Sequence, residues 1–147
     1  MTQEEKELLL KDLCARLPYG LIIQYHYKRG DNCIDEDREL DFSDVETLKY
    51  NNVYPQDNWC EISWKPYLRP MSSMTEEERK ELENKFGIID IDDDLVDFGE
   101  LPSINSVFCL PKLMSLSDWL NKKMFDWRGL IPLNLAIAVT EENNPYK

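Results

Sequence analysis

The chain has 147 residues, of which 42% are hydrophobic and 31% are charged, and its formal net charge is −12. This length is typical of one domain with a single core, and this hydrophobic content argues against an intrinsically disordered chain. The acidic start MTQEEK and the lack of an apolar run of bilayer length argue against a secretory signal and a membrane segment, so we expect a cytoplasmic protein.

The first 58 residues predict one helix, one strand and a weakly patterned segment. Thr2, followed three residues later by Glu5, predicts a capping box, and leucines at helical spacing extend the helix to about Arg16. The β-branched and aromatic run 21–27 predicts a strand, and the polar run after it predicts a turn. For residues 34–58 we expect irregular structure with one short strand, ending in a loop.

Residues 60–70 alternate in polarity, which predicts a half-buried strand. Because its two prolines cannot donate ladder hydrogen bonds, the second half of this strand should be an edge or should leave the sheet. Thr75 and Glu78 have the spacing of a second capping box. They predict the start of a surface helix that ends at Gly87.

The last third of the chain is patterned less evenly. Residues 88–100 fit a short strand and an acidic loop equally well. Further on, Ser117 is a suitable cap for a third helix whose apolar face continues to Trp127 and which ends at Gly129. Alternating polarity over residues 133–139 predicts a final strand.

Together these elements predict an α+β fold, in which about three helices pack on a small, mainly antiparallel sheet. Residues 1–140 are expected to form a single domain, because the sequence shows no internal repeat and no linker. Residues 141–147 are expected to be a frayed tail.

No cofactor or metal site is expected from the candidate ligands. The four cysteines contain no CxxC pair, and we expect them to be reduced thiols that lie mostly in or near the core: Cys14, Cys33, Cys60 and Cys109. The one histidine, His26, favours a structural role over a catalytic one, since no nucleophile motif accompanies it. The acidic run at Asp90, Asp92, Asp93 and Asp94 lacks the spacing of an EF-hand loop and favours a solvated loop.

The negative charge is concentrated in two segments. Residues 31–46 hold eight acids and one base, and residues 74–100 hold eleven acids and three bases. Such surfaces repel phosphate backbones, so we expect no direct binding to nucleic acid. They could instead attract a basic partner protein, or they could serve only to keep the protein soluble.

One mixed patch is the best candidate for a binding site. Three residues of the predicted strand at 60–70 are polar, and three polar or aromatic residues end the predicted third helix. If that helix packs across the strand, the six side chains could form a patch or a structural ion-pair network: Lys65, Tyr67, Arg69, Asp126, Trp127 and Arg128. Arginine and aromatic side chains are common interface anchors, which is why the patch is retained as a site.

Three blocks of the chain resemble a known group of proteins. The segments KPYLRPMSSMTEEERKEL and FDWRGLIPLNLAI, together with LPYG after the first helix, are similar to small uncharacterised proteins encoded by phages and prophages of Bacteroides-type gut bacteria. That group has no assigned activity, so no catalytic residue is implied. The resemblance implies a single small fold in the bacterial cytoplasm or in a phage-associated setting.

Three functions remain open on these observations. The leading hypothesis is a non-enzymatic interaction protein that binds an unknown host or phage protein. A sharper form of it is an acidic mimic of nucleic acid, which inhibits a nucleic-acid-binding protein through Asp35, Glu36, Asp37 and Asp41. The alternative is a small-ligand-binding protein or an enzyme with a site near Tyr67, Arg69, Asp126 and Arg128.

Overall fold

The structure is a computed structural model that describes residues 1–29, 31–50, 61–86, 90–92, 95–97 and 109–147. It begins with the predicted capping box, in which the Thr2 hydroxyl accepts from the Glu5 amide at 3.1 Å and the Glu5 carboxylate accepts from the Thr2 amide at 2.6 Å. Helix α1 follows over Gln3–Arg16, and the 3-10 turn η1, Leu17–Tyr19, leads to Gly20 at φ 70°. The first helix therefore has the bounds that the sequence predicts.

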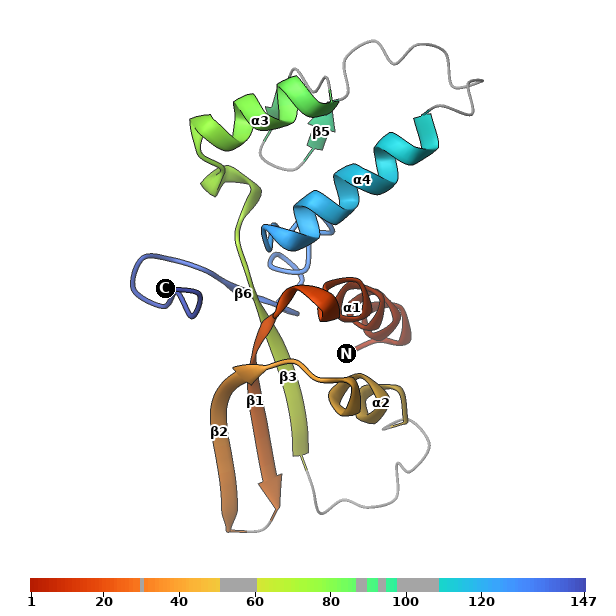
Figure 1. Ribbon diagram of the computed structural model, residues 1–147. Coiled ribbons are helices and arrows are strands. Elements are labelled where there is room, and N and C mark those ends of the chain that lie inside the picture. Colours follow the sequence, from red (N-terminus) through yellow and green to blue (C-terminus); the bar gives the residue numbers. More distant parts are fainter. Residues whose placement is uncertain (30, 51–60, 87–89, 93–94, 98–108) are drawn as a thin grey trace.

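A four-stranded sheet forms the lower half of the molecule in Figure 1. Its strands lie in the order β2 (Asn32–Glu39), β1 (Ile22–Arg29), β3 (Glu61–Leu68) and β6 (Ile137–Ala138), antiparallel except for the β3–β6 pair. The pairing of β3 with β1 ends at Pro66, and the next two residues of β3 pair with β6 instead. Toward β1, the second half of β3 is therefore an edge, which is one of the two outcomes predicted for it.

Helix α2, Phe42–Tyr50, lies in the region for which we predict irregular structure. That prediction is wrong because the helix starts from an Asp–Asp pair instead of the usual Ser/Thr–Glu pair. The Asp41 carboxylate accepts from the Asp44 amide at 3.0 Å, and the Asp44 carboxylate accepts from the Asp41 amide at 3.1 Å. Val45 and Leu48 then pack into the core beside the sheet. Residues 51–60, including the predicted loop, lie outside the described residues.

The second predicted capping box is confirmed. The Glu78 amide donates to the Thr75 hydroxyl at 3.2 Å, the Thr75 amide donates to the Glu78 carboxylate at 3.0 Å, and helix α3 covers Glu76–Phe86. Near α3, strands β4 (Asp90–Asp92) and β5 (Leu95–Asp97) form an antiparallel pair, so of the two alternatives for this segment the strand is found. Gly87, Asp93 and Asp94 lie outside the described residues.

Helix α4 covers Cys109–Lys122, so both predicted ends of the third helix are wrong. Ser117 lies inside the helix, where its hydroxyl donates to the Met114 carbonyl at 2.9 Å. The helix ends early because Met124 adopts φ 59°, and the amide of Phe125 donates to the Leu120 carbonyl at 3.0 Å. This is a Schellman ending, for which glycine is the usual signal, and a methionine at that position cannot be recognised from local pattern alone.

The predicted final strand is mostly a turn. The Leu135 amide donates to the Leu130 carbonyl at 2.9 Å, and Asn134 between them has φ 58°. This is the hydrogen-bond pattern and left-handed backbone that end a helix, and they replace the extended backbone that the alternation predicts. Only the two residues of β6 and the adjacent Val139, whose amide donates to the Leu68 carbonyl at 2.8 Å, pair with β3.

The segment predicted to fray contacts the sheet through Tyr146. The Tyr146 hydroxyl donates to the Tyr67 carbonyl at 2.8 Å and accepts from the Ile22 amide at 3.2 Å. The β1–β3 register would pair these two backbone groups, so the hydroxyl bridges the ladder where the strands diverge. Burial raises the pKa of this phenol to about 12.

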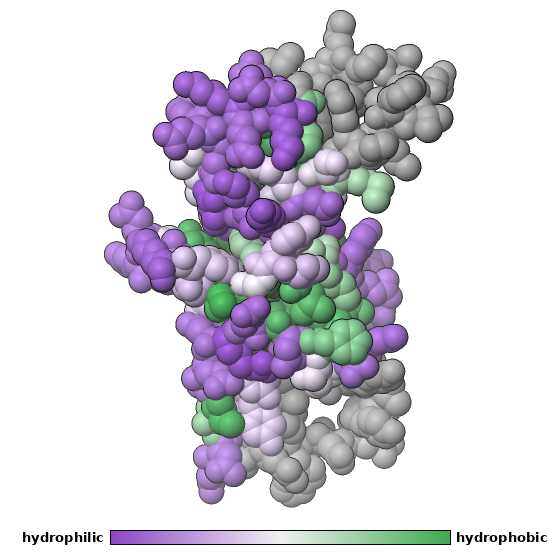
Figure 2. All heavy atoms as spheres, viewed as in Figure 1, coloured by the Kyte–Doolittle hydropathy of each residue, from purple (hydrophilic) through white to green (hydrophobic). Residues whose placement is uncertain are grey.

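The core has two parts. The first lies between the sheet and helices α1 and α2, and the second joins α3, α4 and the 3-10 turn η2, Met71–Ser73 (Figure 1). Trp64 and Leu68 of β3 belong to the first part, and Leu82 and Trp119 belong to the second. Figure 2 shows hydrophilic residues gathered over α3 at the top of the view, as expected for a surface helix.

The fold is therefore α+β, with a mostly antiparallel sheet and, among the described residues, four α-helices where the sequence predicts about three. None of the described helices has the length and apolar character needed to cross a membrane. Cys14 and Cys33 carry free thiols, but both are exposed, so the prediction that cysteines lie in or near the core is wrong for these two.

Candidate functional site

The end of β3 meets the chain that follows α4 through backbone contacts. The Arg69 amide donates to the Met124 carbonyl at 2.7 Å, and the Asp126 amide donates to the Arg69 carbonyl at 2.8 Å. These two bonds form a parallel bridge between Arg69 and Phe125. The predicted crossing of strand and helix is thus made by the segment just after the helix, and it brings Arg69 close to Asp126.

Arg69 is held by an ion pair with Glu78. Two guanidinium nitrogens donate to the two carboxylate oxygens, each at 2.9 Å, and the guanidinium lies 4.2 Å from the centre of the Phe125 ring. Burial of Glu78 opposes its ionisation, but the bonds from Arg69 and the Thr75 amide outweigh it and lower its pKa to about 2. Arg69 therefore fixes the start of α3 against the second part of the core.

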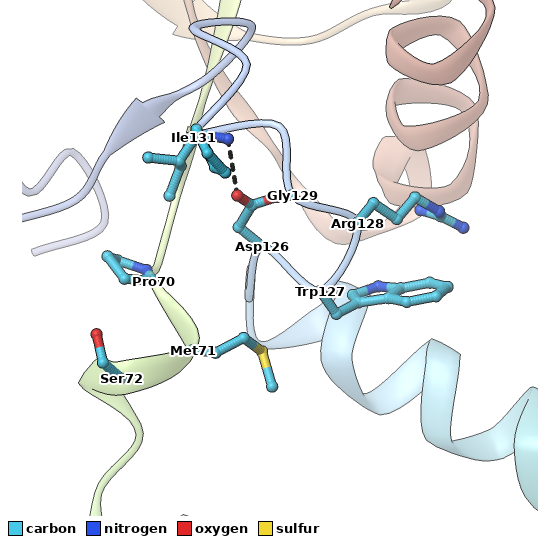
Figure 3. Close-up of a pocket in the computed structure, with 9 residues that line it drawn as sticks. Pro70, Met71, Ser72, Asp126, Trp127, Arg128, Gly129 and Ile131 are labelled. Atoms are coloured by element: carbon cyan, nitrogen blue, oxygen red, sulfur yellow. Dashed lines mark hydrogen bonds between the residues drawn. The ribbon is translucent and has the colours of Figure 1, made fainter. Parts of the chain in front are cut away.

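Asp126 shapes the loop after α4. Its carboxylate accepts from the Leu130 amide at 2.8 Å and from the Ile131 amide at 2.7 Å. Figure 3 shows Asp126 beside a pocket of about 620 Å³ between this loop and η2. The pocket is lined by Pro70, Met71, Ser72, Asp126, Trp127, Arg128, Gly129, Ile131 and Pro132.

Trp127 and Arg128 belong to a network that reaches α1. The Arg128 guanidinium stacks 4.0 Å from the centre of the Trp127 ring and donates to the Asp12 carboxylate at 2.7 Å. Asp12 also accepts two bonds from Arg16, at 2.7 and 3.0 Å, and Arg16 donates to the Phe125 carbonyl at 2.7 Å. Asp12 and Arg16 are both fully buried, so this network joins α1 to the end of α4.

Lys65 and Tyr67 do not line the pocket. The Lys65 ammonium donates to the Asn134 side chain at 2.9 Å, and the Tyr67 hydroxyl donates to the Asp37 carboxylate at 3.0 Å. The alternating polarity of residues 60–70 places Tyr67 on a polar face, but its side chain is buried. Burial and the bond to Asp37 raise the pKa of Tyr67. The six residues of the predicted patch are therefore divided between the pocket, the sheet and the Arg69 ion pair.

The four acids of the predicted interaction surface have different surroundings. Asp41 caps α2 and accepts from the Ser43 hydroxyl at 2.6 Å, which together with the Asp44 amide lowers its pKa. The other three lie on β2, whose side chains are exposed at every position except the half-buried Arg38. The Glu36 carboxylate lies 3.3 Å from Nε of the Arg38 guanidinium. Asp41 is therefore exposed but engaged in the cap of α2, whereas the other three acids belong to the exposed strand β2.

A further group of polar side chains, which the sequence does not predict as a group, lies on the β1–β2 hairpin. The ring nitrogen Nδ1 of His26 lies 2.5 Å from the Asp35 carboxylate, and the Cys33 thiol donates to the other carboxylate oxygen at 3.4 Å. The bond to His26 is the main cause that lowers the pKa of Asp35, and the bond to Asp35 is the main cause that raises the pKa of Cys33. Only the hairpin register brings these residues together, since it pairs His26 with Asp35.

The acidic run considered for a hard cation begins in β4 and continues past the described residues. No family model, no curated protein and no solved structure matches this chain.

Proposed function

We propose that this protein is a non-enzymatic interaction protein that binds a basic protein partner along the edge strand β2. The observation that carries the proposal is the exposure of this strand together with its charge. The sequence NCIDEDRE over Asn32–Glu39 contains four acids and one base, and the strand lies at the end of the sheet order. In Figure 1 β2 forms the free left edge of the sheet, with α1 and α2 on the other side.

The backbone of β2 supports binding of an extended segment. The Leu40 amide donates to the Leu21 carbonyl at 2.8 Å, and antiparallel ladders alternate, so the amides of Cys33, Asp35, Asp37 and Glu39 point away from β1. An extended peptide can add to such an edge by main-chain hydrogen bonds, while charge selects its sequence. Ile34, which is 46% exposed, adds an apolar contact on this strand. The partner chemistry that fits is a basic, extended segment.

The charges of β2 also have a structural role. Acidic side chains on an edge strand discourage pairing with a second copy of the same edge, because like charges would then face each other. This effect favours a partner of opposite charge over self-association. The resemblance to proteins of phages and prophages of Bacteroides-type bacteria adds a setting to the proposal, namely a host or phage protein in the bacterial cytoplasm as the partner.

The test compares two variants with the same change in charge. The first neutralises the edge through Glu36→Gln, Asp37→Asn and Glu39→Gln, and the second neutralises three exposed acids of α3 through Glu76→Gln, Glu77→Gln and Glu83→Gln. Each is used for affinity capture from a lysate of a Bacteroides-type host at low and moderate salt, and captured proteins are purified and measured for direct binding. Asp35 and Asp41 stay unchanged because of their contacts with His26 and α2.

We expect the wild type and the α3 variant to bind the same basic protein, with weaker binding at the higher salt, and the β2 variant to lose it. Equal binding by all three proteins would contradict the proposal. Added duplex DNA distinguishes the acidic mimic from a general interaction protein, because DNA displaces the partner only if the edge occupies a nucleic-acid groove.

The pocket favours a second candidate function, binding of a small molecule. Its volume of about 620 Å³ is within the range of ligand sites, and Met71, Trp127 and Ile131 offer apolar surface. Its polar groups are largely committed, since Asp126 holds the loop amides and Arg128 pairs with Asp12. A fragment screen by NMR on the wild type and on Ser72→Trp tests this function. If fragments change the chemical shifts of pocket residues in the wild type but not in Ser72→Trp, small-molecule binding is favoured over partner binding at the β2 edge.

A further inference from the structure

Three metal-binding side chains converge on the face of the β1–β2 hairpin that is turned away from the helices. His26 is three residues from Ile23, which is buried in the core, so the two side chains lie on opposite faces of the sheet. The register pairs His26 with Asp35, and Cys33 precedes Asp35 by two residues and shares its face. Imidazole, thiolate and carboxylate are three of the side-chain groups that bind zinc.

The backbone geometry explains why these side chains come close. The Leu21–Leu40 pair is hydrogen-bonded, and successive pairs alternate, so His26 and Asp35 form a non-hydrogen-bonded pair. In such pairs the α-carbons and the side chains are closer than in hydrogen-bonded pairs. The three groups are thus positioned by two strands of the sheet, which hold ligands more firmly than loops do.

The distances fit a tetrahedral metal site after small rotations of the side chains. One ligand atom from each residue lies within 4.8 Å of the other two. Zinc bonds of about 2.0 to 2.3 Å place neighbouring ligand atoms about 3.5 Å apart in a tetrahedron. The Nδ1–carboxylate distance of 2.5 Å and the thiol–carboxylate distance of 3.4 Å lie on either side of that value.

The charges also fit a divalent cation. A thiolate and a carboxylate carry two negative charges, and a neutral imidazole adds none, so the set neutralises a dication. Lys28, whose position in the register is opposite Cys33, adds a positive charge that opposes metal binding. The soft sulfur and the imidazole select zinc over calcium and magnesium, which prefer ligand sets made of oxygen.

We propose that His26, Cys33 and Asp35 form a binding site for zinc or a chemically similar divalent metal, with a fourth position open to water. Metal binding links β1 to β2 and neutralises part of the charge of the edge strand. The inference rests on the cluster alone and does not depend on the proposed interaction partner.

Titration with Co²⁺ tests the site, because Co²⁺ takes the place of zinc and a cobalt–thiolate bond gives a charge-transfer absorption in the near ultraviolet. The proteins are the wild type, Cys33→Ser, His26→Gln and the matched control Cys14→Ser, which removes the other exposed free thiol among the residues that the structure describes. We expect the band in the wild type and in Cys14→Ser, its loss in Cys33→Ser, and a roughly tenfold or greater loss of affinity in His26→Gln. Zinc added afterwards should bleach the band.

The proposal is overturned if the wild type gives no charge-transfer band at millimolar Co²⁺. It is also overturned if Cys33→Ser keeps the full band, since the sulfur ligand would then be another cysteine. Circular dichroism before each titration checks that the variants are folded, which is expected because the three side chains are on the surface. The capture variants of the β2 edge leave all three ligands intact, so a failure of the partner proposal and a failure of the metal site are separate results.

Discussion

The network at Asp12, Arg16 and Arg128 and the cluster at His26, Cys33 and Asp35 are both small groups of polar side chains, but they differ in burial. The Asp12 and Arg16 side chains are 0% exposed, whereas those of His26 and Asp35 are 33% and 66% exposed. In the buried network, Arg16 is also bonded to the Phe125 carbonyl. Among the described residues, the side chains of the exposed cluster bond to one another, and solvent can reach them. Burial therefore commits the first group to the fold and leaves the second open to a ligand.

The largest effect on stability is expected for Arg16→Met. This change leaves Asp12 buried with Arg128 as its remaining partner and removes a bond to the Phe125 carbonyl. Breaking a buried ion pair from one side costs about 3 to 5 kcal/mol of unfolding free energy. Urea unfolding measures the loss, and the double variant Asp12→Leu with Arg16→Met should recover part of it. A loss below about 1 kcal/mol would show that the buried network contributes little to stability, which would contradict its structural role.

Protonation of Glu78 should lower the stability of the protein in acid. Its pKa falls from 4.5 to about 2 in the folded protein, so the ionised form stabilises the fold by about 3 kcal/mol above pH 4.5. This contribution is lost as the pH falls from about 4.5 to about 2. Unfolding at several pH values should show a smaller acid loss in Glu78→Gln than in the wild type. Glu83→Gln, an exposed change on the same helix, should follow the wild type.

Tyr146→Phe should cost about 1 to 2 kcal/mol, because it leaves the Ile22 amide and the Tyr67 carbonyl without the bridging hydroxyl. Burial raises the pKa of Tyr146 from 10.0 to about 12, so the folded state holds the phenol proton more tightly than the unfolded state. The corresponding stability is present below pH 10 and is lost as the pH rises from 10 to about 12. Thermal unfolding across that range should show a smaller alkaline loss in the variant. Equal stability of the two proteins at neutral pH would mean that the tail is not held by this contact.

The smallest effect is expected for Asp35→Asn. Its side chain is mostly exposed, and exposed polar contacts contribute little to stability because water replaces them. The unfolding free energy should therefore stay close to that of the wild type, while the affinity for Co²⁺ falls. A large loss of stability without any change in metal binding would reverse the contrast between the exposed cluster and the buried network.

Local rules predicted the elements whose signals lie close together in the chain. Both Thr–Glu capping boxes, at Thr2 and Thr75, are present, and β3 alternates as predicted over residues 63–66. These predictions succeeded because capping and side-chain alternation depend on residues within one or two turns of each other. For the same reason the sequence predicted the α+β class.

The candidate site was predicted only in part. Asp126, Trp127 and Arg128 line the pocket, but its opposite wall at Pro70, Met71 and Ser72 follows from the Arg69–Phe125 bridge. Sequence spacing could not show that Tyr67 bonds to Asp37 or that Arg128 reaches α1, because these contacts join residues 30 and 116 positions apart. Such pairs are known only when the chain path is known.

The sequence by itself determined where α1, β1, β3 and α3 begin, which segments are acidic, and which apolar faces must be buried. The tertiary structure decided where α4 ends, since a methionine adopts the left-handed backbone that its place beside Arg69 requires. It also decided the neighbours of each polar residue, and with them which acids serve the fold and which remain exposed. Local conformation follows from nearby residues, whereas burial and pairing depend on segments that meet only when the chain has folded.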